Sequence, residues 1–155
     1  MIGRYRDGKI PAVPKPDPVS EGFRDTVLHA LRKWDELMRG YQIHLALGEL
    51  WKAVQAANQL IEARAPWKLA KDPDKAGELD ATLADAAAAL ELVLCEAACV
   101  IPATAEAGLA QLGIPGRPGP RQNDWPAWPM EQAGRALGTI TPLFPLLDEE
   151  KAARG

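Results

Sequence analysis

The sequence has few of the side chains that catalysis and metal binding most often use. It contains only two histidines and two cysteines among 155 residues. His29 and His44 fall on separate predicted helices, so we expect surface or partly buried side chains rather than a general base. Cys95 and Cys99 could chelate a metal together, but two ligands without a nearby histidine make a poor zinc site. We therefore expect two small buried thiols, no metal and no cofactor.

Catalytic motifs are missing too. No nucleophile–base pair, carboxylate dyad or glycine-rich phosphate loop is visible. The glycine-containing stretch at residues 116–120 is interrupted by prolines and does not follow a predicted strand. The sequence therefore indicates no catalytic residue in this chain.

A long apolar run and an excess of positive charge are both absent. The most apolar stretch, residues 83–103, contains Asp85, Glu91 and Glu96, and each acid would cost about 2.5 kcal/mol or more near a bilayer centre. The N-terminus has no hydrophobic signal core, so we expect a cytoplasmic protein with no membrane partner. The formal net charge is −3, which argues against a high-affinity nucleic-acid binder, because phosphate neutralisation drives most such affinity. Any RNA contact must use a local site or be helped by another domain.

Strand-like alternation is lacking, and the pattern that is present is helical, with apolar residues at steps of three and four. One helix is expected from Ser20, a plausible N-cap, to Gly40, which offers a left-handed stop. A second helix opens at Tyr41. It should end near Ala65, because Pro66 disfavours helical geometry in the residue before it.

Further helices are expected in the second half of the chain. Asp72-Pro73 combines an N-cap with a proline at the first helical position, and starts a long helix with an alanine-rich middle. Pro102 begins another helix, which Gly113 ends. A short helical piece is expected at residues 131–137. Together these elements predict an all-α helical bundle, in a chain long enough to bury a proper core.

Proline and glycine mark the remaining segments as non-helical. Residues 11–18 are expected to form an extended connector, and residues 113–129 are expected to be irregular. Residues 141–147 are expected to form an extended, Pro-rich C-terminal tail that packs back on the bundle. We divide the chain into a helical domain, residues 1–148, and a disordered tail, residues 149–155. Four tryptophans are expected to be packing residues: Trp34, Trp51, Trp125 and Trp128.

One passage is more informative than the rest. Residues 57–72 read ANQLIEARAPWKLAKD, which is similar to the AN-x-x-I-x-x-x-x-PW-x-LAK stretch of methionyl-tRNA synthetases. Weaker similarities to the same family stand around it in the same order, at residues 5–11, 101–113 and 141–148. The chain thus resembles the helical anticodon-binding domain of that family from residue 1 to about residue 148.

The resemblance implies both a fold and a function. The fold is the helical bundle of the anticodon-binding type found in class Ia aminoacyl-tRNA synthetases. In the family, the proline and tryptophan after the long helix form part of the pocket for the CAU anticodon, and the indole stacks on an unstacked base. Those positions are Pro66 and Trp67 here, and tRNA-Met is the implied partner. Arg64, Lys68 and Lys71 lie beside them as possible contacts to the tRNA backbone.

Physical chemistry is compatible with this role for Trp67 but leaves an alternative open. The residue follows a helix stop at a bundle end, and stacking on an aromatic ring contributes roughly 1–3 kcal/mol per splayed base. The alternative is an indole that caps the core, with Lys68 and Lys71 as ordinary solvated charges.

The chain also departs from the family. The HIGH-like and KMSKS-like motifs of the catalytic domain are missing, so this chain would recognise an anticodon and catalyse nothing alone. The family's first helix begins before the position that matches Met1, and the missing part carries an asparagine and an arginine that read the anticodon. Leu146 stands where the family usually has arginine.

A bundle without part of one helix leaves an apolar groove along its neighbours. Either a separate catalytic synthetase domain or another protein would fit along it. This supports an alternative function, a stand-alone protein-interaction module that binds no tRNA. We expect the groove to be lined by some of Leu47, Trp51, Val54, Leu90 and Leu94.

Overall fold

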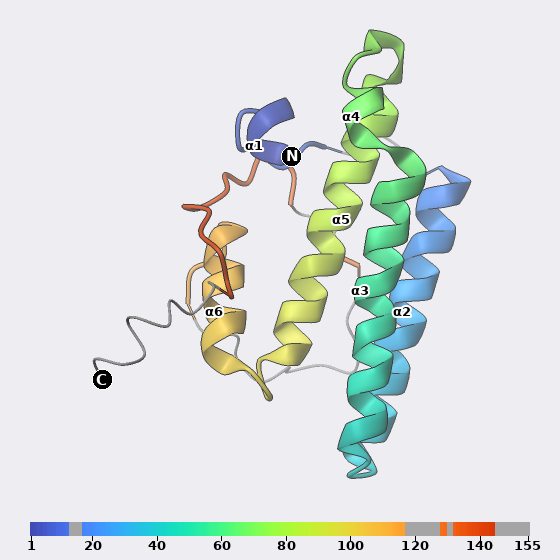
Figure 1. Cartoon of the computed structure of the whole chain (residues 1–155), viewed down its shortest axis with the longest axis vertical. Coiled ribbons are helices and arrows are strands. Elements are labelled where there is room, and N and C mark those ends of the chain that lie inside the picture. Colours follow the sequence, from blue (N-terminus) through green and yellow to red (C-terminus); the bar gives the residue numbers. More distant parts are fainter. Residues whose placement is uncertain (13–16, 117–127, 130–131, 145–155) are drawn as a thin grey trace, which may run out of the picture.

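The computed structural model describes residues 1–12, 17–116, 128–129 and 132–144. Over these residues the chain is a bundle of α-helices (Figure 1), and its β pairing amounts to one isolated bridge between Lys9 and Ala136. The expected all-α fold is therefore confirmed. Residues 141–144 of the expected tail are not helical. Trp125, Leu146 and residues 149–155 lie outside the described residues.

Three long helices make up the body of the bundle: α2 (Pro18–Arg39), α3 (Ile43–Arg64) and α5 (Ala76–Ala97). Helices α2 and α3 form an antiparallel pair, and α5 packs on both of them (Figure 1). The largest group of buried apolar side chains lies where the three helices meet and includes Leu31 and Leu60.

Short elements complete the fold at both ends of α5. They are α1 (Ile2–Tyr5), α4 (Pro66–Leu69), the 3-10 turn η1 (Pro73–Lys75) and α6 (Pro102–Gln111). Helix α6 packs on α5, on the side away from α2 (Figure 1).

Several helix boundaries confirm the sequence signals. Helix α3 ends at Arg64, and Ala65 takes a left-handed conformation (φ 43°, ψ 64°) immediately before Pro66. Asp72 is an N-cap, because its carboxylate accepts a hydrogen bond from the backbone N–H of Asp74 at 3.1 Å. That cap begins η1, and α5 follows directly.

The expected start of the first long helix is wrong, whereas its expected end is confirmed in position, because α2 ends at Arg39 and Gly40 is its C-cap. Asp17, not Ser20, is the N-cap of α2, and its carboxylate accepts hydrogen bonds from the N–H groups of Val19 and Ser20, both at 2.9 Å. Ser20 is instead buried inside the first turn. Gly40 has φ −83°, and the left-handed conformation falls on Tyr41, with φ 56°.

The helical piece expected at residues 131–137 is also wrong for the described part, residues 132–137, which form a turn and an extended strand-like segment. One turn closes within the segment, where the N–H of Arg135 donates to the carbonyl of Gln132 at 3.0 Å, and further backbone groups bond to the loop after α1. The N–H of Leu137 donates to the carbonyl of Gly8 at 2.7 Å, and the N–H of Ile10 donates to that of Arg135 at 3.0 Å. Pairing with a distant segment thus outcompetes local helix formation.

Two of the expected packing tryptophans are confirmed and one is wrong. Trp34 is buried, and its indole N–H donates to Glu96 Oε2 at 3.0 Å. The ring of Trp128 packs edge-on against Phe23, with centroids 5.8 Å apart. Trp51, in contrast, is 62% exposed on α3.

The cysteines also contradict the expectation, because Cys95 and Cys99 are both exposed. Leu92, Val93 and Leu94 supply the buried side of this last part of α5. Cys95 points away from that side, and Cys99 lies beyond the helix end. Across the described residues there is no group of three or more side chains suited to hold a metal ion.

One buried ion pair crosses the bundle. The carboxylate of Asp85, on α5, is 1% exposed, and Arg24 Nη2, on α2, lies 2.7 Å from its Oδ1. The Arg24 guanidinium also stacks 5.4 Å from the centroid of the Trp128 ring. The pair therefore joins two helices and the segment that carries Trp128.

Candidate functional site

Helix α4 forms a small tip beyond the end of α3 (Figure 1), and its two faces differ sharply. Pro66 and Leu69 are buried, and Leu69 packs with Leu79 and Leu83 of α5. Because residues three apart share one face of a helix, these two side chains anchor the tip. The opposite face is thereby turned to solvent.

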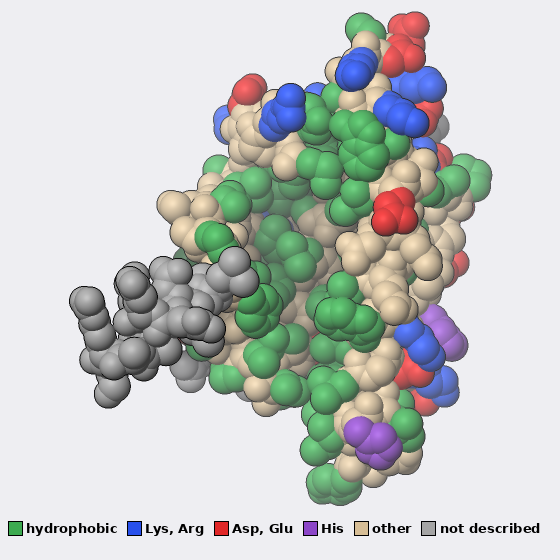
Figure 2. Space-filling view, viewed as in Figure 1, with side chains coloured by type: hydrophobic (Ala, Val, Ile, Leu, Met, Phe, Trp, Pro, Cys, Tyr) green, Lys and Arg blue, Asp and Glu red, His purple; other side chains and the backbone are tan. Residues whose placement is uncertain are grey.

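Trp67 lies on that outer face and is 46% exposed. Lys68 and Lys71 are exposed beside it in the chain. Basic side chains gather at this end of the molecule, with acidic ones among them (Figure 2). The tip therefore presents a large aromatic surface next to positive charge, on a backbone that the buried Pro66 and Leu69 hold in place. This arrangement is suited to stacking on a flat ligand that carries negative charge.

Arg64 has a different environment from the two lysines. Its side chain is only 12% exposed, and its guanidinium forms ion pairs with Asp17 and, at 3.4 Å, with Glu78. These contacts tie the end of α3 to the start of α2 and to α5. Arg64 thus supports the tip from inside, and the exposed cations are Lys68 and Lys71.

Asp17 has two tasks, since it caps α2 and pairs with Arg64. Burial of its carboxylate opposes ionisation, but hydrogen bonds from the Ser20 and Val19 amides and from Arg64, together with the positive charge of Arg64, lower its pKa below the usual 3.8. The folded state therefore binds this proton more weakly than the unfolded state. The resulting stabilisation is present above pH 3.8 and is lost as the pH falls through the lower, folded pKa.

We predict that Asp17→Asn lowers the free energy of unfolding by about 1 kcal/mol at pH 7, because asparagine caps equally well but removes the charge that faces Arg64. Asp17→Ala, which also loses the cap, should cost about 1 kcal/mol more. Urea unfolding at a series of pH values measures both effects. The difference between wild type and Asp17→Asn should shrink below pH 3.8, and a difference independent of pH would contradict the ion-pair account.

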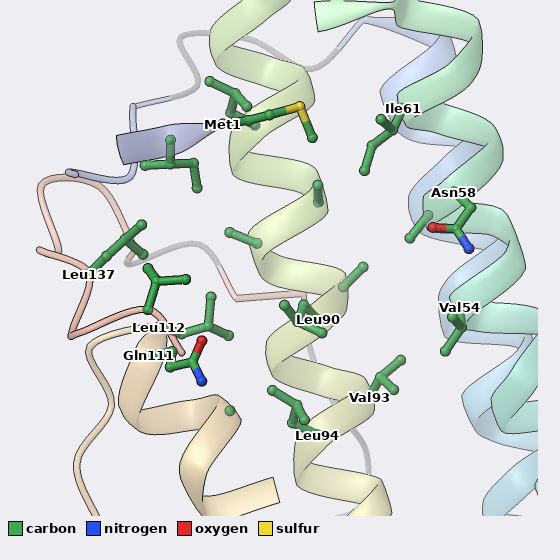
Figure 3. Close-up of a pocket in the computed structure, with 18 of the residues that line it drawn as sticks. Met1, Val54, Asn58, Ile61, Leu90, Val93, Leu94, Gln111, Leu112 and Leu137 are labelled. Atoms are coloured by element: carbon green, nitrogen blue, oxygen red, sulfur yellow. The ribbon is translucent and has the colours of Figure 1, made fainter. Parts of the chain in front are cut away.

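A second feature is a cavity of about 480 Å³ on α5, between α3 on one side and α6 on the other (Figures 2 and 3). Val54 and Leu90 line it and are not buried, which confirms the expected groove for these two residues, whereas Leu94 lines it but is itself buried at 6% exposure. Leu47 and Trp51 do not line the cavity, but both are exposed further along α3. Asn58 also lines it, with its side chain exposed on the α3 wall (Figure 3).

The sequence predicts the residues of the tip, but not the ion pair between Asp17 and Arg64 that supports it. Asp17 was not singled out, although Asp17-Pro18 is the same cap-and-proline signal as Asp72-Pro73. His29 and His44 are exposed, as expected. Within the part of the chain that the structure describes, no helix is long and apolar enough to cross a bilayer.

Comparison of the sequence with known proteins finds relatives of one kind, methionine–tRNA ligases. No protein-family model matches the chain. A methionine–tRNA ligase of Enterococcus faecalis is 31% identical over 152 residues, which cover 97% of this chain and 22% of that protein. One of Deinococcus radiodurans is 35% identical over 150 residues, covering 94% of this chain and 21% of that protein.

The fold also matches solved structures of methionyl-tRNA synthetase. A structure of free methionyl-tRNA synthetase from Mycobacterium tuberculosis matches with a TM-score of 0.81 at 22% identity, over 96% of this chain and 30% of that one. A structure of the same enzyme bound to methionyl-adenylate matches with a TM-score of 0.77 at 20% identity, over 94% of this chain and 28% of that one. The fold is therefore that of a helical bundle found in aminoacyl-tRNA synthetases.

Within that class, the chain belongs to the methionyl-tRNA synthetase family. It spans about a fifth of the length of the curated relatives that it matches.

Proposed function

We propose that the tip around Pro66 and Trp67 binds the anticodon loop of tRNA-Met, as the recognition part of methionyl-tRNA aminoacylation. In this proposal the chain performs no catalysis, and a separate catalytic synthetase domain supplies the aminoacylation chemistry. Membership of the family supports a role in this machinery.

The observation that carries the proposal is the exposure of Trp67 between buried anchors. An indole is among the larger apolar side chains, and leaving one half exposed on a surface forgoes much of its burial energy. Pro66 and Leu69 fix the backbone on either side. The ring is thus held ready for a flat partner, and an unstacked base in an RNA loop is such a partner.

The direct test is a titration of the chain with an anticodon stem-loop that carries CAU, in parallel with the same stem-loop carrying an unrelated triplet. We expect the CAU stem-loop to bind more tightly. Equal affinity for both would contradict anticodon recognition, and no binding to either at low salt would contradict RNA binding.

The exposed lysines lead to a second prediction. If Lys68 and Lys71 each neutralise one phosphate, each Lys→Ala change should reduce the slope of log K against log salt by about 0.7, the value for single strands. Lys33→Ala is the matched control, since Lys33 is exposed on α2 and pairs with Glu36 at 2.7 Å. Affinity measured at several salt concentrations gives the slopes. A slope altered equally by Lys33→Ala would mean that net charge, and not the tip, controls binding.

A second candidate function is protein interaction without tRNA binding. The observation that favours it is the apolar cavity on α5, where Leu90 is 45% exposed. An acidic net charge of −3 also favours it. Failure of both stem-loops to bind, together with a stable protein complex, would support this function over the first.

A further inference from the structure

Helix α1 lies at the same end of the bundle as the tip (Figure 1), and both are anchored in one apolar cluster. Leu69 of the tip is buried there with Leu79 and Leu83 of α5. Tyr5 of α1 is partly buried against the same cluster. Because a close-packed cluster allows little relative movement, α1 and the tip keep fixed positions with respect to each other.

Arg6, directly after α1, strengthens this attachment. Its Nε lies 2.5 Å from Oδ1 of Asp80 on α5, and its Nη1 donates a hydrogen bond to the carbonyl of Tyr5 at 2.7 Å. Both side chains of the ion pair are partly shielded from solvent. The positive charge of Arg6 is therefore used within the fold, where it holds the end of α1 on α5.

Arg4 has a different environment, although only one residue separates it from Arg6. Its side chain is exposed, and its guanidinium lies over the ring of Tyr5, with Cζ 5.7 Å from the ring centroid. Among the residues that the structure describes, no carboxylate forms an ion pair with it. Arg4 thus presents an unneutralised charge to solvent, and the ring limits the orientations of its planar group.

A guanidinium held in this way is suited to bind phosphate. Its N–H donors form a planar fork that matches two oxygens of one phosphate group, and such charge-assisted hydrogen bonds are stronger than neutral ones. Stacking on Tyr5 occupies one face of the plane and leaves the donors at its edges accessible. The ring also orders the group beforehand, which lowers the entropy lost on binding.

Arg4 and Trp67 together define the ligand more closely than either does alone. An exposed indole accepts a flat base and a guanidinium accepts a phosphate, and an RNA loop offers both within one strand. The net charge of −3 makes local contacts of this kind necessary, because the molecule as a whole does not attract polyanions. We propose that Arg4 binds a backbone phosphate of the RNA loop whose base stacks on Trp67, so that the RNA-binding surface extends from the tip to α1. This inference rests on the proposed function.

Titration of the CAU stem-loop at several salt concentrations tests the residue. We expect Arg4→Ala to weaken binding about tenfold, as for one charged hydrogen-bonded contact, and to reduce the slope of log K against log salt by about 0.7. Arg4→Lys keeps the charge but lacks the fork, so the slope should return whereas the affinity should recover only in part. Urea unfolding should show wild-type stability for both variants, because the side chain is exposed.

Arg39→Ala is the matched control. Arg39 is an exposed arginine at the last position of α2, the end away from the tip, and it pairs with Asp35 at 2.8 Å. Its removal changes the net charge by the same amount as Arg4→Ala. It should leave both the affinity and the salt slope unchanged.

Stem-loops modified at one phosphate test the contact itself. Each carries a single methylphosphonate, an uncharged replacement for one phosphate, at a successive position in the loop. With wild type, replacement of the phosphate that Arg4 binds should weaken binding by about the same tenfold. With Arg4→Ala the same replacement should cost nothing further, because the two changes remove one interaction.

The outcomes separate this inference from the proposed function. Wild-type affinity of Arg4→Ala, together with weaker binding by Trp67→Ala, would overturn the inference and leave the proposed function standing. An equal loss from Arg39→Ala would also overturn it, because net charge would then explain the effect. So would methylphosphonates that cost the same in wild type and in Arg4→Ala, since Arg4 would then contact no single phosphate. Absence of binding between wild type and any stem-loop at low salt would overturn both.

Discussion

Replacing Trp67 by alanine should weaken binding of the CAU stem-loop by about 5- to 140-fold, which corresponds to the 1–3 kcal/mol that one stacked base contributes. The loss should be large because the ring is the main apolar surface of the tip. It should leave stability nearly unchanged, because Pro66 and Leu69, not Trp67, anchor α4. The measurement is a titration of both proteins with the same stem-loop, with urea unfolding as a check on the fold.

The chain supplies a well-matched control for this experiment. Trp51 is also an exposed tryptophan, 62% accessible, but it lies on α3, away from the tip. Trp51→Ala removes the same side chain and should leave the RNA affinity unchanged. Equal affinity of wild type and Trp67→Ala would rule out stacking at this site. An equal loss in both variants would indicate a general effect of exposed indoles.

Removal of Arg24 should have the largest effect on stability. Arg24→Met leaves the carboxylate of Asp85, 1% exposed, without its charged partner. Breaking a buried pair in this way costs about 3–5 kcal/mol, because one charge stays buried and uncompensated. The contact between the guanidinium and the Trp128 ring is lost at the same time. Urea or thermal unfolding of the variant measures the change.

Two further variants separate the ion pair from the volume of the side chain. The double variant Arg24→Met with Asp85→Leu replaces both charges by apolar groups and should return to within about 1–2 kcal/mol of wild type. Lys33→Met removes the exposed lysine that pairs with Glu36, and should change stability little, because solvent screens an exposed ion pair. If Arg24→Met is as mild as Lys33→Met, Asp85 does not need its partner and the account of this pair is wrong.

Helix signals that depend on neighbouring residues alone could be predicted from the sequence. Pro66 sets the end of α3, because its ring disfavours right-handed helical geometry in the residue before it, and Ala65 has left that geometry. Asp72-Pro73 begins a helical turn for similar reasons. Where two residues could each be the N-cap, the local sequence does not decide between them. Asp17 and not Ser20 is the N-cap of α2, and Ser20 is buried inside the bundle, a property that one segment of sequence does not reveal.

Exposure of individual side chains was the least predictable property. Trp51 lies on an apolar stripe and was expected to pack, yet no described element covers that part of α3. Cys95 lies in an apolar run, but the buried side of α5 faces elsewhere. In both cases the sequence shows that the residue lies in an apolar stretch, but whether its side chain is buried depends on whether another helix packs there. The groove on α5 was expected from the family resemblance, and Val54 and Leu90 line it.

In the candidate site, too, local features could be predicted from the sequence and contacts between distant residues could not. The two buried anchors and the exposed indole of the tip lie within four consecutive residues, Pro66–Leu69. The environment of Arg64 does not, since its partners Asp17 and Glu78 are distant in sequence. A basic residue beside a motif is thus ambiguous until its counter-ions are known.

The most direct test of the central claim is an NMR titration that follows the indole N–H signals of the five tryptophans as the CAU stem-loop is added. If the tip receives the loop, the Trp67 signal shifts first and furthest, while those of the buried Trp34 and the exposed Trp51 stay in place. A Trp67 signal that does not move while the stem-loop binds would contradict the account.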